Sequence, residues 1–101
     1  MKGESNAAAA VPLTPKFRLG RTVITSNALS KLSRSDIDNG LRRHHCSDWG
    51  DLGAFDCEAN ERALHDGGRL LSAYRSDRGE KFWIITEADR SATTVLMPED
   101  Y

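Results

Sequence analysis

The chain has 101 residues, of which 39% are hydrophobic and 29% are charged. This length leaves room for one hydrophobic core, and the composition is that of a soluble globular domain rather than a disordered or fibrous chain. No apolar run approaches the ~20 residues that cross a bilayer, and the first residues lack the pattern of a secretory signal. We therefore expect a cytoplasmic protein without a membrane span. The two cysteines, Cys46 and Cys57, are too few for a disulfide framework.

Charge is balanced overall but unevenly distributed. Fourteen basic and fifteen acidic residues give a net charge of −1, which argues against a dedicated binder of duplex DNA. Residues 16–45 carry seven basic and two acidic side chains, whereas residues 46–67 carry six acidic and one basic. We interpret the two blocks as solvated helix surfaces of opposite sign. A stripe that binds a phosphate backbone, or an acidic surface for a partner, is the alternative.

The first half of the chain predicts a tail followed by helices. Residues 1–16 contain four consecutive alanines and two prolines without apolar periodicity, which predicts a disordered tail before a single domain at residues 17–101. A short strand is expected within residues 17–24, followed by a helical turn capped by Ser26. Residues 33–36 offer two candidate N-caps for a helix that ends by residue 50. Asp56 is expected to cap a further helix that stops at the glycines 67 and 68.

The last third of the chain has the pattern of strands. Residues 69–75, 81–87 and 92–97 are rich in β-branched, aromatic and aliphatic residues and are separated by polar turns, which predicts an antiparallel meander. In the middle run, Trp83 and Ile85 alternate with Phe82 and Ile84, so both faces of this strand are apolar. Such a strand is either covered on both sides or presents one face to a partner. The predicted fold is α+β, with two or three helices on one face of a three- to four-stranded antiparallel sheet.

Three segments carry a family resemblance. They are residues 48–52 (DWGDL), residues 68–74 (GRLLSAY) and, above all, residues 81–101 (KFWIITEADRSATTVLMPEDY). They resemble the small plasmid-related proteins of bacterial plasmids and integrative conjugative elements. The resemblance implies a mobile genetic element as the genomic context, with accessory, defence or anti-defence work, and it brings no catalytic residue. Some of these proteins are described as methylase subunits of type I restriction systems. The present chain lacks the glycine-rich loop and the Asn-Pro-Pro-aromatic motif that a DNA methylase needs.

Metal binding is not supported by the spacing of potential ligands. His44, His45 and Cys46 are consecutive. Cys46 and Cys57 are separated by more residues than the Cys-x2-4-Cys spacing that zinc sites use. Adjacent histidines on a helix point in directions about 100 degrees apart and do not easily share one ion. We therefore predict neither a metal nor a cofactor.

An alternative function is that of a nucleic-acid-directed protein, such as a toxin-like ribonuclease. RNA cleavage needs an acid, a base and a cation around one phosphate. The candidate residues for this interpretation are His44, Tyr74, Arg75, Glu87 and Arg90. These residue types are also ordinary in strands and surface ion pairs, so the pattern has little specificity.

The leading hypothesis is a small non-enzymatic protein-binding module, because no constellation of residues has a catalytic spacing. Its partner would be another protein or a second copy of the chain. The residues expected to bind are Trp49, Trp83, Ile85 and Arg90. Large aromatic side chains and arginines are the residues that most often anchor protein interfaces.

Overall fold

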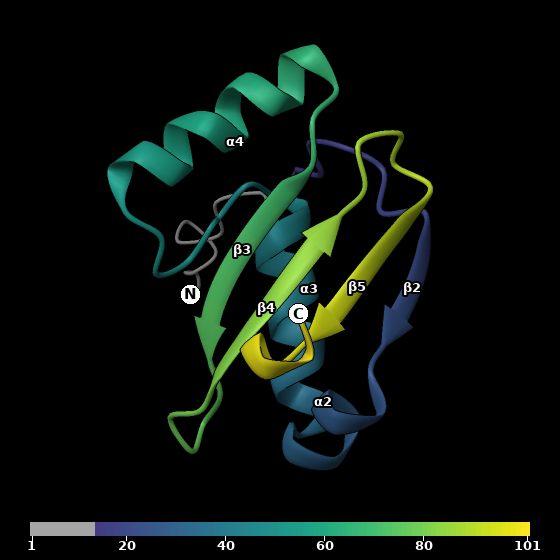
Figure 1. Cartoon of the computed structure of the whole chain (residues 1–101), viewed down its shortest axis with the longest axis vertical. Helices are drawn as coiled ribbons and strands as arrows, with labels where there is room; N and C mark the ends of the chain where they lie inside the picture. The colour runs from purple at the N-terminus through teal and green to yellow at the C-terminus, as the bar shows by residue number, and fades with distance from the viewer. Residues whose placement is uncertain (1–13) are drawn as a thin grey trace, which may run out of the picture.

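The computed structural model describes residues 14–101 (Figure 1). Most of the predicted tail, residues 1–16, thus lies outside the described residues. The elements in chain order are β2 (Arg21–Ile24), α2 (Ser26–Lys31), α3 (Arg34–His45), α4 (Ala54–Asp66), β3 (Leu70–Arg75), β4 (Lys81–Thr86), β5 (Ala92–Leu96) and the 3-10 turn η1 (Pro98–Asp100). Within this part of the chain, no helix is long and apolar enough to cross a membrane.

The helices begin at identifiable caps. At α3 the hydroxyl of Ser33 accepts the N–H of Asp36, and the Asp36 carboxylate accepts the N–H of Ser33, both at 3.0 Å. Helix α2 is capped by Thr25 instead of the predicted Ser26. Helix α4 starts after Gly53, so Asp56 lies in its first turn, where a negative charge is favoured by the helix dipole, and is not its N-cap.

The fold is α+β, and its sheet is mixed. The strand order is β2-β5-β4-β3. Strand β4 pairs antiparallel with both β3 and β5, whereas β2 pairs parallel with β5. The prediction of a wholly antiparallel sheet is therefore wrong for β2. Parallel neighbours need a long crossover, and three helices and two strands separate β2 from β5 along the chain.

The hydrophobic core lies between α3 and one face of the sheet, which we call the inner face. Figure 1 shows α3 behind the sheet, while η1 is the only described element that crosses the opposite face. The core consists of Ala28, Leu32, Ile37, Tyr74, Phe82, Ile84, Val95 and Met97. Gly40 lets α3 approach closely, since a Cβ there would lie 2.9 Å from the Phe82 ring. Helix α4 contacts β3 at the edge of the sheet and does not lie on its inner face, which corrects part of the predicted packing.

The β3 edge of the sheet is closed by two other parts of the chain. The Asn60 side chain of α4 donates to the carbonyl of Leu71 at 2.7 Å and accepts the N–H of Leu71 at 3.1 Å. Two residues further on, Ala73 exchanges backbone hydrogen bonds with the carbonyl of Trp49 and the N–H of Asp51. The outward polar groups at these two positions of β3 are thus paired, and another strand cannot pair with them.

The Asn60 contact has a measurable consequence for stability. Asn60→Ala leaves the partly buried N–H and C=O of Leu71 without these partners, so we expect the free energy of unfolding to fall by about 1 to 3 kcal/mol. Urea denaturation measures this change. The control is Asn39→Ala, because Asn39 is exposed and accepts only from Arg42. An Asn60 variant as stable as the Asn39 variant would show that the edge contact contributes little.

Candidate functional site

His44 lies at the centre of a buried hydrogen-bond network on the inner face. The carbonyl of Leu19 can only accept, so the Thr93 hydroxyl donates to it at 2.6 Å. Thr93 then accepts from Thr86 at 2.7 Å, and Thr86 accepts from Nε2 of His44 at 2.9 Å. This sequence of donors assigns the His44 proton to Nε2. The bare Nδ1 is left to accept the hydroxyl proton of Ser72 at 2.6 Å.

The environment of His44 keeps its imidazole neutral and out of reach. Burial, helped by the nearby charges of His45 and Arg90, lowers the pKa of His44 to about 3. His44 and the other side chains of the network, those of Ser72, Thr86 and Thr93, have no exposed surface. A proton on His44 therefore cannot be passed to a bound phosphate in this conformation. The network joins α3 to three strands and has the character of a structural core.

Tyr74 is held beneath Arg43. The Arg43 guanidinium lies 4.6 Å from the centre of the Tyr74 ring and forms two hydrogen bonds with the carboxylate of Asp48, of 2.7 and 3.2 Å. The Tyr74 hydroxyl donates to the carbonyl of Asp48. Burial raises the pKa of Tyr74 well above its usual range, and the hydrogen bond from Arg43 holds the pKa of Asp48 below its own. Tyr74 is thus a neutral, anchored side chain.

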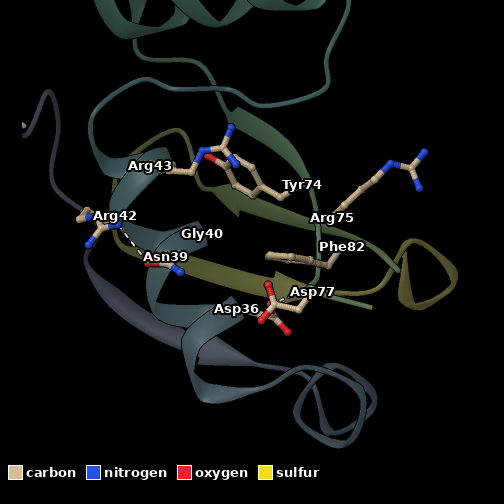
Figure 2. Close-up of a pocket in the computed structure, with 9 residues that line it drawn as sticks. All are labelled: Asp36, Asn39, Gly40, Arg42, Arg43, Tyr74, Arg75, Asp77 and Phe82. Atoms are coloured by element: carbon tan, nitrogen blue, oxygen red, sulfur yellow. Dashed lines mark hydrogen bonds between the residues drawn. The ribbon is translucent and has the colours of Figure 1, made fainter. Parts of the chain in front are cut away.

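A pocket of about 290 Å3 opens beside Tyr74, between α3 and the β3–β4 turn (Figure 2). It is lined by Asp36, Asn39, Gly40, Arg42, Arg43, Tyr74, Arg75, Asp77 and Phe82. Burial raises the pKa of Asp36, but backbone hydrogen bonds from Ser33 and Asp77 outweigh this and hold it below its usual value. Figure 2 shows Arg75 extending away from the other lining residues. The pocket holds charges of both signs that already contact neighbours, and this arrangement selects no anion or cation.

Arg90 serves as a clamp between the β4–β5 turn and α4. Its guanidinium donates to the carbonyls of Ala63, Gly68 and Glu87 at 2.9, 2.6 and 3.1 Å. Arg90 also has a left-handed backbone conformation, with φ of 62°. The carbonyl of Ala63 belongs to the last turn of α4, where a positive charge compensates the helix dipole. The guanidinium is therefore occupied by backbone contacts, while the Glu87 carboxylate pairs with Arg69 at 3.5 Å.

Trp49 is enclosed between α3 and α4. Its indole is 5% exposed, stacks on Phe17 and donates its Nε1–H to Glu61 at 2.9 Å. A side chain with so little free surface cannot anchor a partner without a rearrangement. Trp49 thus packs the junction between α4 and the rest of the domain.

Trp83 and Ile85 lie on the face of the sheet opposite α3, which we call the outer face. Two cross-strand rows form it: Val23, Thr94, Ile85 and Leu71 in one, and Leu96, Trp83 and Ala73 in the other. Ile85 is nearly buried among its neighbours, whereas Trp83 is half-buried. Hollows of about 360 and 240 Å3 flank the indole of Trp83. The outer face is therefore an apolar surface with Trp83 as a ridge between two depressions.

Tyr101 and basic side chains border the outer face. The Tyr101 ring meets Trp83 edge to face, with ring centres 5.8 Å apart, and its hydroxyl accepts from Arg69 at 3.0 Å. Arg75 lies 3.7 Å from Asp51, and Lys81 lines the same hollow. Sequence reasoning did not single out Tyr101 as a binding residue, because a terminal aromatic has no periodicity that shows which face it covers.

Comparisons of the chain with protein-family models, with curated proteins and with solved structures found no match. What the site does is therefore inferred from its own residues. Within residues 14–101, no three His, Cys, Asp or Glu side chains gather closely enough to hold a metal ion. Of the residues predicted to bind a partner, Trp83 is the large apolar side chain that is half-buried on the outer face, whereas Trp49 and Ile85 are buried.

Proposed function

We propose that this chain is a small protein-binding module of a mobile genetic element that acts through the outer face of its sheet. The observation that carries the proposal is the apolar outer face, which among the described helices only the short turn η1 crosses (Figure 1). Trp83 stands between two hollows on this face. Contiguous apolar patches bordered by polar side chains are typical of interaction sites, and tryptophan is enriched among the residues that dominate binding energy.

The chemistry of the outer face favours a protein with an apolar patch flanked by acidic residues. Its centre is aliphatic. At its border Arg69 pairs with Glu87 and Arg75 pairs with Asp51, so that Lys81 gives these five charges a net sum of +1. Single-stranded nucleic acid needs aromatic platforms on which bases stack. The planes of Trp83 and Tyr101 are inclined at 68° and form no common platform. The observations thus favour a protein partner over RNA.

The family resemblance supports the genomic part of the proposal. Its most specific segment, residues 81–101, builds β4, β5 and η1, and therefore supplies Trp83, Ile85 and Tyr101. The residues that carry the resemblance are thus the ones that form much of the outer face. The resemblance also suggests accessory, defence or anti-defence work, for which recognition of another protein is a suitable activity.

The proposal is tested by selecting peptides from a displayed library and measuring their affinity by fluorescence anisotropy. We expect binders with apolar residues flanked by Asp or Glu. Trp83→Ala should weaken their binding by at least about tenfold, since it removes the ridge between the hollows. The matched control is Phe55→Ala, because Phe55 is 76% exposed on α4 and lines neither of the two hollows.

A parallel titration with short single-stranded RNA of mixed sequence distinguishes the two classes of partner. Tryptophan fluorescence reports on the outer face, because Trp49, the second tryptophan, is enclosed. Selected peptides that bind Trp83→Ala as tightly as the unmodified protein would overturn the proposal. RNA that quenches Trp83 and competes with the peptides would replace it with the nucleic-acid interpretation.

A further inference from the structure

The second edge of the sheet, formed by β2, is open in the part of the chain that the structure describes. Strand β2 pairs only with β5 among residues 14–101, and in Figure 1 nothing lies beyond it on the other side. The N–H groups of Arg21 and Thr25 donate to Ser91 and Val95, at 2.9 and 3.0 Å. Because backbone direction alternates along a strand, Thr22 and Ile24 point their N–H and C=O groups away from β5. These groups can pair with another strand.

An apolar groove runs beside this open edge. Its volume is about 530 Å3, and it is lined by Ile24, Leu29, Leu32, Arg34, Ile37, Asp38 and Leu41. Leu29, one of the lining residues, is 62% exposed. Arg34 and Asp38 pair with each other at 3.6 Å, so the border of the groove has no net charge. The groove thus suits an uncharged, apolar occupant.

We propose that β2 pairs antiparallel with β2 of a second copy of this chain, about a two-fold axis at Val23. This register places Thr22 opposite Ile24 of the second copy, and Ile24 opposite Thr22 of the second copy. Each of these two pairs exchanges both backbone hydrogen bonds, which gives four in all. Ile24 faces the inner side of the sheet, as its register partner Val95 does, so the grooves of the two copies meet on that side.

The two edges of the sheet explain why the occupant is a second copy. A pair joined through β2 has β3 at both of its outer edges, where Asn60 and the backbone of residues 49–51 block further pairing. The assembly therefore closes at two copies and cannot grow into a fibre. The groove, neutral and apolar, is compatible with an identical groove. This interface uses a different surface from the outer face and goes beyond the proposed function.

Analytical ultracentrifugation over a range of concentrations tests the proposal on the full chain. We expect a reversible monomer–dimer equilibrium that is weakened at least about tenfold by Leu29→Glu, which places a charge in the groove, and by Thr22→Pro, which removes an outward N–H. Three variants should keep the equilibrium: Phe55→Glu, a matched exposed apolar side chain; Thr22→Val, which retains the N–H; and Trp83→Ala. Circular dichroism checks that each variant is folded.

Amide hydrogen exchange followed by NMR gives a second readout. The amides of Thr22 and Ile24 should exchange quickly in dilute protein and slowly in concentrated protein, whereas that of Val23 is protected in both. A monomer at every concentration with rapid exchange at Thr22 and Ile24 would overturn the proposal. So would a monomer in which these amides are protected, since a segment of the same chain would then cover the edge. A dimer that neither Leu29→Glu nor Thr22→Pro weakens would also overturn the proposal, because the two copies would then associate through another face.

Discussion

Acidification from pH 6.5 to 4.5 is expected to reduce the free energy of unfolding by about 2 kcal/mol through His44 alone. In the folded protein the pKa of His44 is lowered from 6.5 to about 3, so only the unfolded chain takes up a proton across this interval. The unfolded state binds more protons, and stability therefore falls as the pH falls. The stabilisation is fully present above pH 6.5 and is lost toward pH 3. The acid end of the interval lies just above the pKa values of unfolded carboxyl groups, about 3.9 for Asp and 4.3 for Glu, so these groups add a smaller loss there.

Urea denaturation at a series of pH values measures this dependence, with two variants as references. His44→Gln can keep one donor and one acceptor, and we expect it to be less stable than the unmodified protein at neutral pH. Because glutamine does not titrate, the stability of this variant should change much less between pH 6.5 and 4.5. Asn39→Ala, which changes no titrating group, should retain the slope of the unmodified protein. An equal slope in His44→Gln would mean that other groups cause the acid sensitivity.

Gly50→Ala is expected to lower the free energy of unfolding by about 3 kcal/mol or more, or to prevent folding. Gly50 has φ of 76°, and a Cβ there would overlap the carbonyl oxygen of Ala73 and lie 2.7 Å from the Tyr74 ring. The close approach is required because the flanking residues 49 and 51 pair with Ala73 at the β3 edge. An added methyl group would push this segment off the strand and open the edge.

Gly67→Ala separates the collision from the cost of the backbone conformation. Gly67 ends α4 with φ of 82°, and a Cβ at this position would meet nothing within 4 Å. Its replacement should therefore cost only the left-handed penalty of about 1 to 2 kcal/mol. Thermal and urea unfolding of the two variants measure the difference. If the two substitutions reduce the free energy of unfolding equally, the approach of Gly50 to β3 is looser than the structure indicates.

The local patterns in the sequence were sufficient for most elements of the fold. The strands at β3, β4 and β5 follow from alternating apolar residues between polar turns, and α3 follows from the cap at Ser33. Ile37 and His44 are seven positions apart in α3, which places them on one helix face, and both are buried. The two apolar faces of β4 already indicated that one face meets helices and that the other needs a cover or a partner.

Other features depend on segments that meet only after folding. The parallel pairing of β2 with β5, the closure of the β3 edge by Asn60 and the clamp made by Arg90 join residues that are distant in the chain. For Asn60 the sequence held one local indication of burial, because Asn60 lies on the same face of α4 as the apolar Ala63 and Leu64. Local patterns determine which residues become helix or strand and which faces are apolar. Which edge closes, which face stays open and which polar groups pair inside the core are decided by long-range contacts, because only these bring the partners together.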